Sequence, residues 1–275
     1  MKKSVVYLLL IITLGACSPY QNALKSDDIA LKYKIADSLY NQKKYKKSLK
    51  LWEQIVPTYR GRPQAERVMY LYSDSYYQLG DYYLAGYQFE RFANAYPQSE
   101  KREEASYKSS KSYYELSPRY NLDQADTDKA LDKLKNFVNS YPESDYFDEV
   151  NGMIQELNIK VQKKAFEIAK QYNKISNFPA SLKALDNFIS EYPGSVYREG
   201  AIYYKLDSQY RYATGSLSGL VKERLESAKG IYENLIRFYP DGEYRERADE
   251  IMNNITKGLE TYTENNNIEE DAKDK

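Results

Sequence analysis

Small and large apolar residues recur along the chain at helical spacing in five separate segments. Each segment has a small residue, a large apolar residue four positions later, another after three more, and a Tyr after a further four. The five sets are Ser48, Trp52, Ile55 and Tyr59; Ala85, Phe89, Phe92 and Tyr96; Ala130, Leu134, Phe137 and Tyr141; Ser181, Leu185, Phe188 and Tyr192; and Ala228, Tyr232, Leu235 and Tyr239. These steps place each set on one face of an α-helix. A pattern that occurs five times predicts a protein of stacked helical repeats.

The residues that follow each Tyr predict where the helices end. Pro comes directly after the Tyr in four repeats, at Pro97, Pro142, Pro193 and Pro240. Because Pro cannot continue a helix and disfavours the helical conformation of the residue before it, we expect these helices to stop at Tyr-Pro. Ser follows two positions later at Ser99, Ser144 and Ser195. Since Ser is a favoured N-cap residue, we expect it to begin the next helix.

The predicted fold is all-α. Residues 29–262 are expected to form a right-handed solenoid of about five tetratricopeptide-like helix pairs, followed by a C-terminal capping helix. The first helix of the fourth repeat is predicted to be unusually long, over roughly residues 145–172. Residues 263–275 are polar and acidic and are predicted to be disordered.

The first residues are typical of an export signal. Lys2 and Lys3 precede a short apolar run that ends in Leu-Gly-Ala-Cys, with the cysteine at Cys17. The run is too short to span a bilayer permanently, so residues 1–16 are predicted to be a lipoprotein signal peptide. Cys17 is the only cysteine and is predicted to be acylated, for example with palmitate, with residues 17–28 as a tether to the folded domain. The alternative is a buried helix start with an incidental cysteine.

Composition excludes several classes of function. The chain has 40 basic and 40 acidic residues, and this balance argues against nucleic-acid binding. It has no His, which excludes a His general base, a Ser-His-Asp triad and His metal ligands. It also lacks the Gly-rich phosphate-binding motifs. We therefore predict a protein that is not an enzyme and that needs no cofactor or metal.

The first helices carry a second pattern, in which Tyr, a charged residue and Tyr lie four and three positions apart. The residues are Tyr33, Asp37 and Tyr40; Tyr70, Asp74 and Tyr77; Tyr107, Lys111 and Tyr114; and Tyr203, Asp207 and Tyr210. This spacing forms one stripe on each helix, and first helices line the concave surface of such a stack. The fourth repeat breaks the pattern, with Ala165, Ala169 and Tyr172.

Two interpretations of this stripe are open. In the first, the phenol rings and carboxylates form a peptide-binding groove, since Tyr offers a flat apolar face and a hydroxyl that can pair with a peptide backbone. In the second, the rings pack between helices and the charged groups only solvate the surface.

Two stretches resemble the BamD family, the lipoprotein subunit of the β-barrel assembly machinery in Gram-negative outer membranes. Residues 70–99 are similar to the second repeat of the family, through Leu79-Gly80-Asp81-Tyr82, Ala85, Phe89, Phe92, Tyr96-Pro97 and Ser99. Residues 123–144 are similar to its third repeat, through Asp123, Gln124, Thr127, Ala130, Phe137, Tyr141-Pro142 and Ser144. The resemblance covers about residues 17–262, and the lipoprotein signal adds to it.

The resemblance implies a non-catalytic scaffold, anchored by lipid to the periplasmic side of the outer membrane. Its implied partners are the POTRA domains of BamA, other subunits of the complex and unfolded outer-membrane proteins. The long helices over residues 145–172 and 217–239 are candidates for the BamA contact, and the stripes of the first two repeats for the substrate. Two rival functions remain: a tetratricopeptide lipoprotein of another envelope system, such as cell-wall remodelling or secretion, and a glycan-binding lipoprotein.

Overall fold

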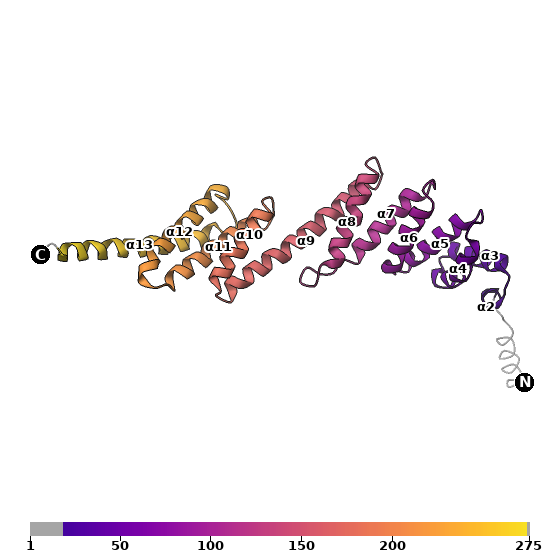
Figure 1. The fold of residues 1–275 in the computed structure, drawn as a ribbon, viewed down its shortest axis with the longest axis horizontal. Helices are drawn as coiled ribbons and strands as arrows, with labels where there is room; N and C mark the ends of the chain where they lie inside the picture. Colours follow the sequence, from indigo (N-terminus) through magenta and orange to yellow (C-terminus); the bar gives the residue numbers. More distant parts are fainter. Residues whose placement is uncertain (1–18, 274–275) are drawn as a thin grey trace, which may run out of the picture. The chain divides into compact units, whose positions relative to one another are not determined.

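The computed structural model describes the backbone of residues 19–273 and the side chains of residues 19–261. The predicted signal peptide and Cys17 lie outside these residues. The described part is all-helical, as predicted, with twelve helices and no strand. The helices are α2 Pro19–Lys25, α3 Ile29–Asn41, α4 Tyr45–Tyr59, α5 Ala65–Gln78, α6 Tyr82–Ala95, α7 Arg102–Glu115, α8 Ala125–Ser140, α9 Phe147–Lys174, α10 Phe178–Glu191, α11 Arg198–Thr214, α12 Ser218–Phe238 and α13 Arg245–Lys273 (Figure 1).

The helices confirm the predicted helical repeat. Five pairs follow one another, α3 with α4, α5 with α6, α7 with α8, α9 with α10 and α11 with α12, and α13 comes after the last pair. The chain divides into two compact units. Unit 1 contains residues 1–118 and 123–155, and unit 2 contains residues 119–122 and 156–275.

Within unit 1, each helix from α3 to α7 packs against the next helix in the chain. Within unit 2, α10, α11, α12 and α13 pack in the same consecutive way, and α11 also contacts α13. This arrangement buries one helix of each pair between its own partner and the following pair, as a stack of helical repeats requires.

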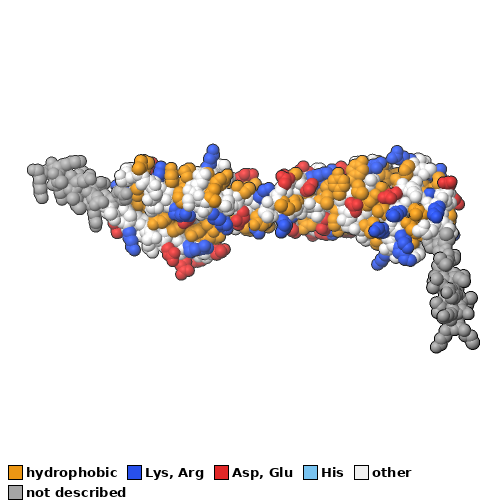
Figure 2. Space-filling model, turned by 90° about the horizontal axis from the view of Figure 1, so that it is seen from below, with side chains coloured by type: hydrophobic (Ala, Val, Ile, Leu, Met, Phe, Trp, Pro, Cys, Tyr) orange, Lys and Arg blue, Asp and Glu red, His pale blue; other side chains and the backbone are white. Residues whose placement is uncertain are grey.

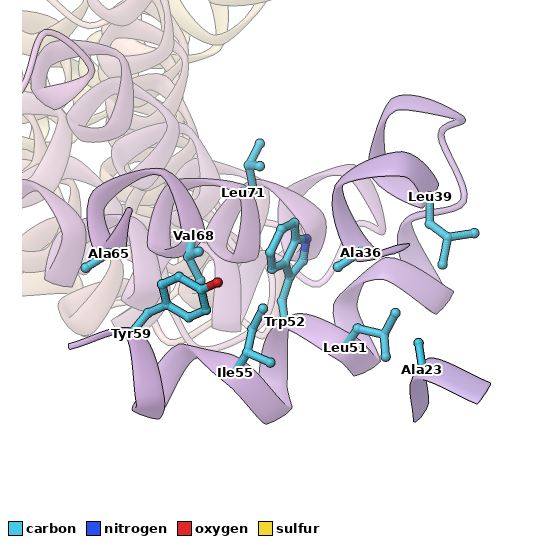
Figure 3. Close-up of a cluster of buried hydrophobic side chains, with 10 residues drawn as sticks. All are labelled: Ala23, Ala36, Leu39, Leu51, Trp52, Ile55, Tyr59, Ala65, Val68 and Leu71. Carbon is cyan, nitrogen blue, oxygen red and sulfur yellow. The ribbon is translucent and has the colours of Figure 1, made fainter. Parts of the chain in front are cut away.

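The five predicted sets of small and large apolar residues, which we call the apolar columns, form the core. Trp52 and Ile55 of α4 lie in one buried cluster with Ala36 of α3 and Val68 of α5 (Figure 3). In the later repeats, Phe89, Phe92, Leu134, Phe137, Leu185, Phe188 and Leu235 are also buried. If the last Tyr of each set is left aside, Tyr232 is the one member of the apolar columns that is half-buried and not buried. The columns thus connect each second helix to the first helices on both sides.

Small residues bring neighbouring helices close together. Ser48 Oγ on α4 donates to the carbonyl oxygen of Ala36 on α3 at 2.7 Å, and Ser109 Oγ on α7 donates to that of Gly86 on α6 at 2.9 Å. A Cβ atom added to Gly86 would lie only 3.2 Å from the Tyr113 ring. A larger residue at this position would therefore force α6 and α7 apart.

The Tyr-Pro sites end their helices as predicted. Tyr96, Tyr141, Tyr192 and Tyr239 are the C-cap residues of α6, α8, α10 and α12. The first repeat has no Pro after Tyr59, and α4 ends at Tyr59 itself.

The prediction that Ser would cap the next helix was wrong in position. α7 begins at Arg102 with Lys101 as its N-cap, two residues after Ser99. The hydroxyl oxygen of Ser99 accepts from the Lys101 backbone N–H, so it orders the turn rather than the helix start. Ser144 and Ser195 do the same for the N–H groups of Tyr146 and Tyr197.

Two of these turns are also held from the preceding first helix, by a glutamate in the first turn of that helix. Ser99 Oγ donates to Glu66 at 2.6 Å, and Ser144 Oγ donates to Glu103 at 2.5 Å. In the last repeat Glu199 instead accepts from the Tyr244 backbone N–H at 2.9 Å. Gly242 stands where the other turns have Ser, and a Cβ atom there would collide with Glu199. Each glutamate thereby fixes the start of the next repeat.

Two segments differ from the sequence-based expectation. Within the predicted tether, Pro19–Lys25 forms α2, which packs on α3 and α4 and buries Ala23. Tyr20, Ala23 and Leu24 have the spacing of a short apolar helix face, which explains this packing. At the other end, the backbone of α13 stays helical through Lys273, into the segment predicted to be disordered. No Pro or Gly follows Gly258 to end that helix.

Candidate binding surface

The charged and phenolic stripes of α3, α5 and α7 come together in unit 1. We call this set the first-helix ladder: Tyr33, Asp37, Tyr40, Tyr70, Asp74, Tyr77, Tyr107, Lys111 and Tyr114. Six of its members contact residues of the next first helix about one repeat further along the chain: Asp37, Tyr40, Tyr70, Asp74, Tyr107 and Lys111. The stripes therefore share one side of unit 1, as the periodicity predicts.

Asp74 is the most buried charge of the ladder, with 1% of its surface exposed. Its carboxylate accepts from the Tyr40 hydroxyl on α3, from Gln78 Nε2 at 3.2 Å, and from Lys108 Nζ on α7 at 2.6 Å. Burial and the hydrogen bond to Asp74 both raise the pKa of Tyr40. A single carboxylate of the second repeat thus joins the first helices of three repeats.

Lys108 neutralises this carboxylate, and the sequence analysis missed it. Its ammonium also lies 2.9 Å from Glu104 and 3.1 Å from the Tyr70 hydroxyl, and 5.3 Å from the centre of the Tyr70 ring. Burial alone would lower the pKa of Lys108, but the hydrogen bond to Asp74 and the charge of that carboxylate raise it above its ordinary value. The matching residues of the first, second and fifth repeats are Lys34, Leu71 and Tyr204, so the position follows no constant pattern along the chain.

Glu104 forms a second centre of charge. It accepts from the Tyr70 hydroxyl at 2.5 Å and pairs with Lys101 at 2.8 Å, besides its contact with Lys108. Burial opposes ionisation, but hydrogen bonds from Lys101, Tyr70 and Lys108 outweigh it and lower the pKa of Glu104 to about 2. The corresponding residue one repeat earlier is Arg67, which pairs with Asp37 at 2.5 Å.

The ladder residues of α7 form a similar arrangement with the charges exchanged, because here the ladder residue is the lysine, Lys111, and its partner is the carboxylate. Tyr107 donates to Glu149 at 2.7 Å, while Lys111 Nζ contacts the Tyr107 hydroxyl at 3.0 Å and Glu149 at 2.8 Å. Burial is the main reason that the pKa of Tyr107 rises to about 12. The Tyr107 ring stacks on Tyr146, with ring centres 3.9 Å apart. Glu149 lies outside the stripe pattern, and periodicity did not reveal it.

The tyrosine rings themselves pack into the core of their own repeats. Tyr33 lies 5.7 Å from the Trp52 ring, Tyr70 lies 5.5 Å from Phe92, and Tyr77 lies 6.2 Å from Phe89, all measured between ring centres. Tyr114 is half-buried on α7. The packing interpretation therefore describes the rings. The hydroxyls of Tyr40, Tyr70 and Tyr107 connect consecutive repeats, and the peptide-groove interpretation stays a prediction for the ladder's exposed edges.

In unit 2, the fourth repeat continues the stripe in a register shifted by one residue from the predicted one. Counting back from the small residue Ser181 places Phe166, Lys170 and Asn173 at the stripe positions, not Ala165, Ala169 and Tyr172. Lys170 Nζ lies 5.5 Å from the Phe166 ring and 5.1 Å from the Tyr204 ring. The substitution of Phe and Asn for Tyr hid this register from the sequence analysis.

The fifth repeat completes the pattern in unit 2. Asp207 accepts from Asn173 Nδ2 at 2.6 Å, with the same 34-residue separation as Tyr40 and Asp74. Tyr203 lies 4.7 Å from the Tyr244 ring, and Tyr210 packs against the core of α11, α12 and α13. All three predicted residues are thus half-buried parts of the repeat contacts.

Within the part of the chain that the structure describes, no cluster of Cys, Asp and Glu has the arrangement of a metal site. Over the same residues, none of the helices combines the length and the apolar character that crossing a membrane requires. The candidate surface consists of hydrogen bonds, ion pairs and aromatic contacts.

Comparison with known proteins agrees with the resemblance in the sequence. The family model YfiO, described as an outer membrane lipoprotein family, matches residues 26–183, more than half of the 275 residues. The match includes every residue of the first-helix ladder. No curated protein sequence is significantly similar to the chain.

The ionised Glu104 makes the ladder sensitive to acid. Its pKa is lowered on folding, from 4.5 to about 2, so its stabilising contribution is fully present above about pH 4.5 and is lost as the pH falls toward about 2. We expect Glu104→Gln to lower the free energy of unfolding near neutral pH but to lose less further stability between about pH 5 and about pH 3 than the original protein does. Urea denaturation followed by circular dichroism at both pH values measures this.

Glu100→Gln is the matched control, because Glu100 is exposed and forms none of the ion pairs of the described residues. Its unfolding should follow the original protein at both pH values. An unchanged acid response in Glu104→Gln would show that this carboxylate does not stabilise the ladder.

Proposed function

Because the chain belongs to the YfiO family of outer membrane lipoproteins, we propose that it is a non-catalytic scaffold of the β-barrel assembly complex, lipid-anchored on the periplasmic side of the outer membrane. In this proposal it binds the POTRA domains of BamA, other subunits of the complex, and unfolded outer-membrane proteins during their folding and insertion. The family match over residues 26–183 carries the proposal.

The edges of the first-helix ladder are the proposed site for unfolded outer-membrane proteins. The Arg67–Asp37 and Lys111–Glu149 pairs keep part of their surface in solvent, with Arg67 55% and Glu149 47% exposed. They flank the half-buried rings of Tyr33, Tyr77 and Tyr114. An extended segment that alternates aromatic and polar residues presents groups that match both, and such contacts at exposed pairs are weak enough to be released.

The proposed BamA contact lies on unit 2. Ile168 of α9 is 50% exposed, Ile175 in the turn directly after α9 is 59% exposed, and Leu217 before α12 is 81% exposed. Large apolar side chains at such exposure are typical of an interaction surface when they gather on neighbouring turns. α9 and α12 are also the long helices that the sequence analysis marked for this contact.

The glycan-binding alternative would be favoured by an exposed tryptophan that can stack on a sugar ring. Trp52, the only tryptophan, is fully buried in the core of the first repeat and cannot stack on a sugar ring. A scaffold of another envelope system predicts the same fold, so only its partners distinguish it.

Affinity purification from membranes tests the scaffold role. We expect a tagged protein extracted in mild detergent to retain BamA, and the Ile168→Ser, Ile175→Ser double variant to retain several-fold less. The matched control is Tyr83→Ser with Tyr87→Ser, which removes an equally exposed pair from α6 in unit 1. Absence of BamA from the original eluate would contradict the scaffold role. Equal BamA in all three eluates would contradict only the placement on α9.

Site-specific photocrosslinking tests the substrate surface. A photoreactive phenylalanine at Tyr77 or Tyr114 should crosslink to an unfolded outer-membrane protein that is added to the purified protein. The same group at Tyr87, which is 50% exposed on the second helix α6, serves as the control and should crosslink weakly. If Tyr87 crosslinks as strongly as the other two positions, the ladder is not the substrate surface.

A further inference from the structure

A dense group of lysines surrounds the turn between α3 and α4. Residues 41–50 contain five lysines and no acidic residue, namely Lys43, Lys44, Lys46, Lys47 and Lys50. All five are exposed. Over the wider segment of residues 29–52 the only carboxylate is Asp37, which is already paired with Arg67. The balanced charge of the whole chain therefore conceals a strongly basic first repeat.

Nothing within the described residues neutralises these lysines. Within the described residues none of them takes part in an ion pair; Lys44 Nζ donates to Gln42, and Lys47 lies over the Tyr20 ring. The arrangement is unfavourable for α4, which has no acidic residue in its first turn although a helix N-terminus favours negative charge. α3, α6, α10 and α12 also lack an acidic residue there, but α4 alone of these five begins with two lysines, Lys46 and Lys47, in its first turn. We call Lys43, Lys46, Lys47 and Lys50 the α4 lysine patch.

The patch lies beside the start of the folded domain. α2 packs on both α3 and α4, and Lys47 Nζ is 5.4 Å from the centre of the Tyr20 ring. Cys17 is three residues before Tyr20, a span of at most about 11 Å even for an extended chain. Figure 2 shows Lys and Arg side chains gathered over the end of unit 1 where α3 and α4 lie. An acyl chain on Cys17 would therefore hold the patch close to the membrane surface.

We propose that the α4 lysine patch binds the anionic phospholipid headgroups of the membrane in which the lipid anchor is inserted. The inference rests on the predicted lipidation of Cys17 but not on any protein partner. A lipid anchor does not by itself fix the orientation of the folded domain, and a polybasic patch near the surface is attracted to anionic headgroups. The patch also orients the first repeat, because only the side of unit 1 that carries α4 can then face the headgroups.

Vesicle binding tests this with the mature chain from residue 17, in which Cys17→Ala removes the acyl chain. We expect the protein to sediment with vesicles that contain phosphatidylglycerol but not with pure phosphatidylcholine vesicles, and high salt should release it. Changing Lys43, Lys46, Lys47 and Lys50 to Gln should lower the vesicle partition coefficient by about tenfold or more. Changing the same four lysines to Arg should preserve it.

The matched control replaces four exposed lysines of unit 2, Lys174, Lys183, Lys222 and Lys257, with Gln. It removes the same charge and should bind vesicles like the original chain. Circular dichroism verifies that the variants are folded. Equal loss in both quadruple Gln variants, or binding that does not depend on phosphatidylglycerol, would overturn the proposal. So would a patch variant that binds vesicles normally but loses a protein partner. A negative result here leaves the BamA purification unaffected, so the two proposals fail separately.

Discussion

Each helix pair of this protein buries its apolar columns only when the next pair covers them. A lone pair would leave one face of its second helix in water, because the column residues contact first helices on both sides. Stacking in turn brings charged groups of successive first helices together, and these must be paired if they are buried. Asp74 illustrates the constraint: it is almost fully enclosed, and it is held by Tyr40 from the repeat before and by Lys108 from the repeat after.

This construction suits a scaffold. The charged groups of the first-helix ladder are held in mutual hydrogen bonds and ion pairs, so their positions relative to one another are fixed. The exposed groups that remain fall into distinct regions: ladder edges on unit 1, apolar side chains on α9 and near α12, and lysines around the start of α4. A membrane, a folded partner and an unfolded client could each use a different one, which is consistent with an outer membrane lipoprotein family.

The sequence predicted the fold well because its signals were repeated. The columns and the Tyr-Pro stops are local patterns, so the core and the C-caps at Tyr96 and Tyr141 match the structure. Positions that vary between repeats gave no such signal: Lys108 stands where other repeats have Leu71 or Tyr204, and Glu149 reaches the ladder from outside the stripe. The lysine patch was missed for another reason, because net charge averages over the whole chain. The stripe residues were found, but periodicity could not show that their hydroxyls pair across repeats.

A double-mutant cycle between Asp74 and Lys108 tests the central claim that buried charge pairs join successive repeats. Asp74→Asn and Lys108→Met are each expected to lower the free energy of unfolding by about 2–4 kcal/mol, because each leaves a charge without its main partner. The double variant should lose no more than the worse single variant, which corresponds to a coupling energy of about 2 kcal/mol or more. Strictly additive losses in urea denaturation, with no coupling, would contradict the account.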